Sequence, residues 1–197
     1  MTRPLPLVIP ALIVLSTAAE AHTGIGSTGG FEHGFAHPFS GLDHVLAMVA
    51  VGLYAASLGG RALYFVPAAF LAVMAAGSVI GIGGIALPFV ELGIGLSVVA
   101  LGVAVAFRIG LPMMAAMGLV GFFAIFHGHA HGAEMPYDAS GLSYALGFVL
   151  ATALLHAIGI GFGLSTSFAG ERTATGAAQA AGAAIALAGV GLIFNLL

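Results

Sequence analysis

A group of histidine and acidic residues lies at residues 37–44, directly ahead of an apolar stretch. It reads His-Pro-Phe-Ser-Gly-Leu-Asp-His and supplies His37, Asp43 and His44. Charged residues make up only 6% of the chain, so polar ligands gathered in one place are unusual. Asp43 and His44 are adjacent and would point about 100° apart on a helix. They can serve one metal ion only if the helix end is irregular; otherwise they serve two neighbouring sites. Pro38 is expected to start the helix.

A second group, at residues 126–134, reads Phe-His-Gly-His-Ala-His-Gly-Ala-Glu and closes another apolar stretch. His127, His131 and Glu134 stand at positions i, i+4 and i+7, which form one stripe of a helix. Two imidazoles one turn apart with a carboxylate are a common way to present nitrogen and oxygen ligands to a divalent metal. His129 falls on the other side of that helix, and we expect it and His33 to be solvated loop residues.

The donor types narrow the choice of metal. The chain has no cysteine, and imidazole and carboxylate without sulfur favour Ni²⁺, Co²⁺ or Zn²⁺ over Cu⁺. We therefore expect the two groups to meet in space and to bind one of these divalent ions.

Three further residues are candidates for the same metal. Glu91 opens the third apolar segment and His156 lies in the middle of the fifth. Because an ionisable group inside a bilayer is costly, each is predicted to belong to a pathway or a coupling step. For His156 the alternative is a hydrogen bond to a neighbouring carbonyl. His22 would offer its amine and its imidazole as a chelate if it became the N-terminus of the mature protein.

The composition requires helices in a membrane to position these residues. Hydrophobic residues make up 60% of the chain, and it has only four basic residues in 197, which excludes a soluble domain with a charged surface. A glycine-rich stretch at residues 24–29 matches G-x-G-x-x-G, but no strand precedes it, so a dinucleotide site is not expected. No prosthetic group and no nucleic-acid partner are predicted, and whether the chain forms a homo-oligomer is left open.

The first 21 residues have the pattern of a secretory signal peptide. Arg3 precedes an apolar core, and Ala-Glu-Ala at residues 19–21 is a small-x-small cleavage site. The alternative is an uncleaved first membrane helix. We expect cleavage, which leaves residues 22–197 as a single six-helix transmembrane domain with an irregular outer segment at residues 23–36.

Six apolar segments follow, at residues 42–58, 62–85, 88–107, 111–127, 142–164 and 175–196. Each must be helical because lipid offers no partner for unpaired backbone groups. The fourth helix is expected to run on to about residue 135. Small residues at 77–81 and 176–191 predict tight helix seams.

The charges predict the orientation of these six spans. With a cleaved signal, both mature termini are periplasmic. The linkers that follow the first, third and fifth apolar segments then face the cytoplasm. Those linkers hold Arg61, Arg108 and Arg172, the only basic residues left after cleavage, as the positive-inside rule requires. Five acidic residues and seven of the eight histidines then fall at or near the outer ends, and only Glu171 lies inside; the five are Glu32, Asp43, Glu91, Glu134 and Asp138.

The two histidine groups resemble the HupE/UreJ family of nickel and cobalt permeases. The likeness covers nearly the whole mature chain, and neither motif departs from the family pattern. It rests on His37-x₅-Asp43-His44, continuing as Leu46-Ala47-Met48-x-x-Val51-Gly52, and on Phe126-His127-Gly128-x-x-His131-Gly132-x-Glu134.

The resemblance implies a small multi-pass carrier in the bacterial inner membrane that imports Ni²⁺ or Co²⁺ for hydrogenase or urease maturation. It marks His37, Asp43, His44, His127, His131 and Glu134 as motif positions. One alternative is an intramembrane zinc hydrolase that uses the same ligands to activate water. Another is a metal sensor or chaperone-like membrane subunit without transport.

Overall fold

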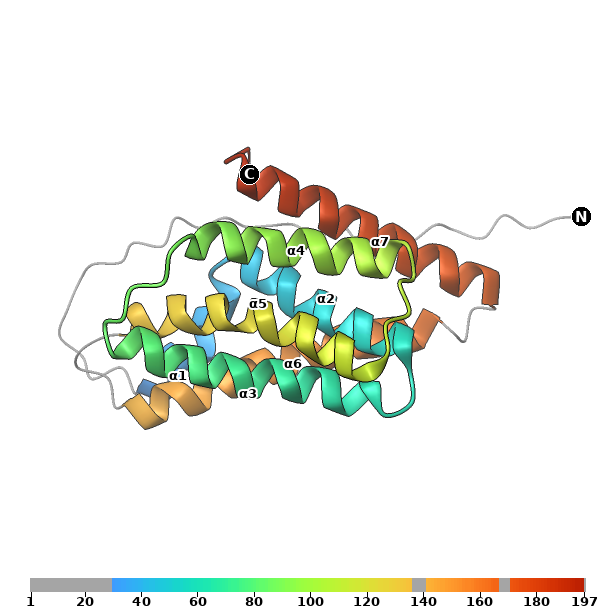
Figure 1. Cartoon of the computed structure of the whole chain (residues 1–197). Coiled ribbons are helices and arrows are strands. Elements are labelled where there is room, and N and C mark those ends of the chain that lie inside the picture. Colours follow the sequence, from blue (N-terminus) through green and yellow to red (C-terminus); the bar gives the residue numbers. More distant parts are fainter. Residues whose placement is uncertain (1–29, 136–140, 167–170, 197) are drawn as a thin grey trace, which may run out of the picture.

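The computed structural model describes residues 30–135, 141–166 and 171–196, and within these ranges the regular structure is helical throughout (Figure 1). The predicted signal peptide, His22 and the residues up to Gly29 lie outside the described residues. The helices are α1 (Gly30–Ala36), the 3₁₀ helix η1 (His37–Phe39), α2 (Leu42–Leu58), α3 (Ala62–Ile82), α4 (Val90–Ala106), α5 (Met113–Ala133), α6 (Gly141–Thr166) and α7 (Glu171–Ile193). Each of the six predicted apolar segments therefore coincides with one of the helices α2 to α7.

Several of these helices are long and apolar enough to cross a membrane. Four qualify by themselves, namely α3, α5, α6 and the part of α7 from Gly176 onward, and the pair formed by α1–η1 and α2 qualifies as a fifth, bent span. The apolar helix α4 has only 17 residues and falls short of that length. The all-helical, multi-pass architecture agrees with the prediction, whereas six spans, a cleaved signal and periplasmic termini remain predictions.

The start of the chain's described part differs from the prediction in two ways. Residues 30–36 form the short helix α1, although an irregular segment was expected there. Pro38 does not start the first long helix, because it lies within η1 and α2 begins only at Leu42. The chain turns by 80° between these two parts, with Gly41 in an extended conformation at the bend. Because of this bend, His37 does not lie on the extension of the α2 axis.

Successive long helices run in opposite directions, which sorts the loops to the two ends of the bundle (Figure 1). The α2–α3 and α4–α5 connections lie at one end, and they carry Arg61 and Arg108. At the other end α2, α4 and α6 begin and α5 finishes, so the two histidine groups lie there. Arg61 and Arg108 are thus separated from the two histidine groups by the length of the bundle.

Helices α3 and α5 pack in close contact through glycines. A Cβ atom at Gly77 or Gly81 would meet the backbone of α5, and one at Gly128 would collide with the carbonyl of Met74 on α3. The seam predicted for residues 77–81 is therefore present. The last helix also packs closely, since Gly182 of α7 lies against the backbone of α4. Such close contacts fix the position of α5 along its own axis relative to the neighbouring helices, and they therefore also fix the positions of its histidines.

Replacing Gly128 by alanine is expected to lower the free energy of unfolding by about 1–3 kcal/mol, because the added methyl group has no room between the backbones of α5 and α3. Thermal unfolding in detergent measures this effect. Gly118→Ala is the matched control, since it lies on the same helix and a Cβ there meets nothing within 4 Å. Equal stability of the two variants would contradict a close α3–α5 contact.

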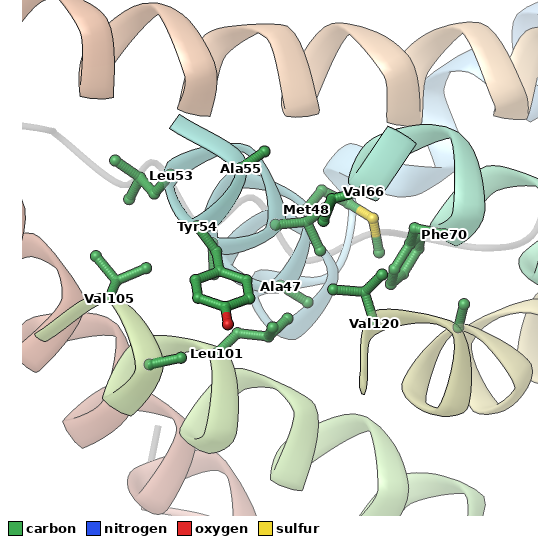
Figure 2. Close-up of a cluster of buried hydrophobic side chains, with 14 of the residues drawn as sticks. Ala47, Met48, Leu53, Tyr54, Ala55, Val66, Phe70, Leu101, Val105 and Val120 are labelled. Atoms are coloured by element: carbon green, nitrogen blue, oxygen red, sulfur yellow. The ribbon is translucent and has the colours of Figure 1, made fainter. Parts of the chain in front are cut away.

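The interior of the bundle is filled around α2 (Figure 2). Tyr54 is fully buried beside Leu101 and Val105 of α4, and its hydroxyl donates a hydrogen bond to the carbonyl of Ile109 at 3.1 Å.

Helix α6 has one exposed apolar face and one buried face. Its outward stripe at every fourth position is apolar and exposed, as expected for a face in contact with lipid: Leu142, Leu146, Leu150, Leu154 and Ile158. Its buried stripe is Tyr144, Phe148, Thr152 and His156.

Candidate metal centre

Three residues form the mouth triad, a name used here for His37, His131 and Glu134. Each offers one ligand atom, and the three atoms lie within 4.8 Å of one another, the one such group within the described ranges. His37 Nε2 lies 3.3 Å from Glu134 Oε2. The Glu134 side chain is 61% exposed, whereas His131 is buried at 3% exposure. The triad therefore connects solvent with the interior.

The local structure explains how these three residues meet. Helix α5 continues to Ala133, with Glu134 as its C-cap residue, so His131 and Glu134 share the last turn. His37 reaches them because the 80° bend directs η1 away from the axis of α2. In a straight helix His37 would instead lie two turns from His44 along a single helix face.

Asp43 and His44 interact directly with each other. Asp43 Oδ1 accepts a hydrogen bond from the backbone N–H of His44 at 2.8 Å and lies 3.0 Å from His44 Nδ1. Because an ionised carboxylate can only accept, Nδ1 carries a hydrogen, and in the neutral ring Nε2 then keeps the lone pair. His44 Nε2 is buried and has no hydrogen-bond partner among the described residues. Asp43 thus orients His44 rather than pointing independently toward the mouth triad.

The histidines of both sequence groups touch one another in a continuous imidazole row, defined as His37, His131, His44 and His127. The ring centroids are 4.7 Å apart for His37 and His131, and 4.1 Å apart for His131 and His44. The rings of His44 and His127 are 4.7 Å apart. The structure therefore brings the two groups together at one end of the bundle, as expected from the sequence.

The row continues inward through an aromatic ring. Phe70 of α3 lies 5.7 Å from His127 and 5.3 Å from His156, measured between ring centroids. His156 is 1% exposed, and neither of its ring nitrogens has a partner within the part of the chain that the structure describes. The carbonyl hydrogen bond considered for His156 is not present there. His156 thus lies beyond Phe70, deeper in the bundle than the imidazole row.

Glu91 lies at the rim and not in the buried row. It is exposed and lines an open cavity of about 180 Å³ together with His44, His131 and Glu134. A neighbouring cavity of about 500 Å³ shares Asp43 and Glu91 with the first. Two carboxylates therefore flank the approach to the mouth triad.

The expectation for His129 was wrong. It is buried on α5 at 9% exposure, and its Nε2 lies 2.8 Å from the carbonyl oxygen of Ile85. This contact links α5 to the loop after α3, so the role of His129 is structural. His33 is exposed as expected, although it lies on α1 and not in a loop.

Sequence reasoning missed several residues around the row. Ser97 of α4 lies 2.8 Å from His127 Nε2, and Phe148 of α6 contacts His131 with ring centroids 4.1 Å apart. Tyr144 and Thr152 are buried nearby on α6, and their hydroxyl oxygens have no partner among the residues described. The i, i+4 spacing of residues 144, 148, 152 and 156 could have revealed the α6 stripe. A lone serine in an apolar segment gives no such signal.

The arrangement suits a divalent transition metal. It combines exposed carboxylates at the rim with buried imidazoles behind them, and it contains no sulfur donor. Carboxylates attract a hydrated cation, and imidazole nitrogens then favour transition metals over Mg²⁺ or Ca²⁺. The site can therefore capture a cation from solvent and offer it nitrogen ligands as it loses water.

Comparisons with known proteins find a matching family and a similar protein. The sequence matches the protein family described as HupE / UreJ protein over residues 10–192. It is 48% identical to Protein HupE of Rhizobium leguminosarum bv. viciae over 184 residues, which cover 93% of this chain and 94% of that protein. No solved structure matches the chain.

Proposed function

We propose that this chain, which belongs to the HupE/UreJ family of metal transporters, imports Ni²⁺ or Co²⁺ from the periplasm across the bacterial inner membrane. In this proposal it is a secondary transporter that supplies the metal for hydrogenase or urease maturation. The observation that carries the proposal is the imidazole row, which leads from a solvent-exposed carboxylate into the interior of the bundle.

Buried ring nitrogens without partners support a cation pathway. Both nitrogens of His131 and of His156 lack hydrogen-bond partners within the described ranges. Leaving a buried polar atom unsatisfied costs about 1–3 kcal/mol, so a row of them is hard to explain by packing alone. A passing cation would bind in turn to the one nitrogen lone pair that each neutral ring offers.

The proposed sequence of steps follows the geometry. The carboxylates of Glu91 and Glu134 attract the hydrated cation, and the mouth triad replaces part of its water. The cation then moves along the imidazole row and past Phe70 toward His156. Rearrangement of the helices around it would open the way to the other side.

The membrane potential can drive this movement. Moving one elementary charge inward is worth about 2.3 kcal/mol per 100 mV, so a dication gains about 4.6 kcal/mol at a potential of about 100 mV. Uptake therefore needs no ATP if the outer end of the bundle is the end with the histidines. The distribution of Arg61 and Arg108 to the opposite end supports that orientation.

The alternative of an intramembrane zinc hydrolase is not favoured. The family to which the chain belongs consists of metal transporters and not of enzymes. The imidazole row also extends beyond a single coordination sphere, whereas a hydrolase needs its ligands around one fixed metal.

Uptake of radioactive nickel into proteoliposomes tests the proposal. Replacing His44 by alanine should lower the initial uptake rate at least about 10-fold, because it interrupts the imidazole row. His33→Ala is the matched control, since that histidine is exposed on α1. Metal binding without uptake by the native protein would instead indicate a sensor, and uptake unaffected by the loss of His44 would contradict the pathway.

A further inference from the structure

The hydroxyl of Ser97 lies within hydrogen-bond distance of both a backbone carbonyl and the ring of His127. Ser97 Oγ donates to the carbonyl oxygen of Ile94 at 2.6 Å, an i−3 bond within α4. A hydroxyl has one hydrogen, so toward His127 Nε2, at 2.8 Å, the same oxygen can only accept. With this donation to Ile94, Nε2 of His127 is the protonated nitrogen, and its Nδ1 keeps the lone pair. That Nδ1 atom is buried and has no partner in the described part of the chain.

The neighbouring ring is held in the same way by a different partner. Asp43 accepts the hydrogen of His44 Nδ1 and leaves the lone pair on Nε2. The two rings are 4.7 Å apart and nearly perpendicular, at 87°. His44 is 8% exposed and His127 is 0% exposed. In this arrangement the two adjacent imidazoles have opposite nitrogens protonated, and each keeps one buried lone pair without a partner among the described residues.

This pattern is that of metal ligands oriented by partners behind them. A metal-ligating histidine usually donates its second ring N–H to a carboxylate, a carbonyl or another acceptor, which fixes its tautomer and its ring orientation. The mouth triad does not include His44 or His127. The geometry points to a second, inner position for the transported cation, formed by His44 Nε2 and His127 Nδ1, with Ser97 and Asp43 as positioning residues. The inference rests on the proposed function for the identity of the cation.

His131 connects the two positions. It belongs to the mouth triad, and its ring also lies 4.1 Å from that of His44. A cation could therefore keep one nitrogen ligand while it exchanges Glu134 for His44. The inner position offers nitrogen from His44 and His127 where the mouth offers a carboxylate, so transfer inward would select against Mg²⁺ and Ca²⁺, which prefer oxygen.

Cobalt binding to purified protein in detergent tests the inner position directly. The double variant His37→Ala, Glu134→Gln removes two ligands of the mouth triad and is expected to bind one Co²⁺ per chain. Adding Ser97→Ala should weaken that binding about 10- to 100-fold, because the tautomer of His127 is no longer fixed. Adding Ser57→Ala should change it less than about 2-fold. Ser57 makes a comparable i−3 hydrogen bond, to the carbonyl of Tyr54 at 2.7 Å, and it lies at the opposite end of α2.

A nitrogen-15 NMR spectrum of histidine-labelled protein provides a measurement that packing alone would not change. In metal-free native protein, His127 should be the Nε2–H tautomer, and Ser97→Ala should give a mixture or the other tautomer. His127→Gln assigns the signal. No cobalt binding by the double variant, or a His127 tautomer with hydrogen on Nδ1, would overturn the inference.

The outcome for the inner position is separable from that of the proposed function. If the native protein shows no nickel or cobalt uptake but the double variant binds cobalt in a Ser97-dependent way, transport is wrong and the inner position stands. If uptake occurs and depends on His131 while the double variant binds no cobalt, the inner position is wrong and transport stands.

Discussion

Replacing His131 by alanine is expected to abolish nickel or cobalt uptake, with a loss of at least about 100-fold in the initial rate. This residue links the mouth triad to the inner histidines, because its ring contacts both His37 of the triad, at 4.7 Å, and His44, at 4.1 Å. Its loss removes a ligand from the mouth and leaves a gap in the row. At about 1.4 kcal/mol per tenfold change, losing one buried ligand worth several kcal/mol accounts for an effect of this size.

The control for this prediction is a second buried histidine of the same helix. His129 is also on α5, but its ring binds the carbonyl of Ile85 and lies outside the row. His129→Ala should lower the thermal stability and leave the uptake per folded molecule within about 3-fold of native, a margin set by the context-dependence of such contacts. Similar losses of uptake per folded molecule in both variants would show that the row has no special role.

Replacing His156 by leucine is expected to stop uptake while metal binding at the mouth is retained. His156 is buried deep in α6, beyond Phe70, and does not contact the mouth triad in any ring contact that the described residues make. The same change should leave the melting temperature equal or raise it, because it replaces two unsatisfied buried nitrogens by an apolar side chain. Proteoliposome flux, cobalt binding and thermal unfolding measure the three quantities.

Ala157→Leu is the matched control, since it alters the next residue of α6 on an exposed position. Normal flux in His156→Leu would remove His156 from the pathway. Loss of mouth binding in that variant would show that the two regions are not separate.

Much of the fold could be predicted because lipid leaves the backbone few options. An apolar segment in a membrane must satisfy its own hydrogen bonds, so hydropathy located the helices, and α2 has the predicted bounds of 42–58. Helix α5 was also predicted beyond its apolar part. That part ends near His127, the sequence predicted a continuation to about residue 135, and the helix ends at Ala133.

Part of the site could also be predicted, for a similar reason. His127 and His131 share a helix face because they are one turn apart, which needs no tertiary information. The position of His37 could not be predicted, since it depends on the 80° bend between η1 and α2. Ser97 could not be found either, because its role depends on the contact between α4 and α5 and not on any local pattern. His129 was misassigned because its partner, the carbonyl of Ile85, is 44 residues away.

We propose that nitrogen and oxygen donors from both histidine groups bind one divalent cation, and X-ray absorption of nickel-loaded protein tests this binding most directly. The native protein should show a nitrogen and oxygen shell at about 2.0–2.1 Å with the multiple scattering of histidine rings, and no sulfur. His131→Ala should lose part of the ring scattering, whereas His33→Ala should not. A shell of water oxygens alone, or an identical spectrum in His131→Ala, would contradict the account.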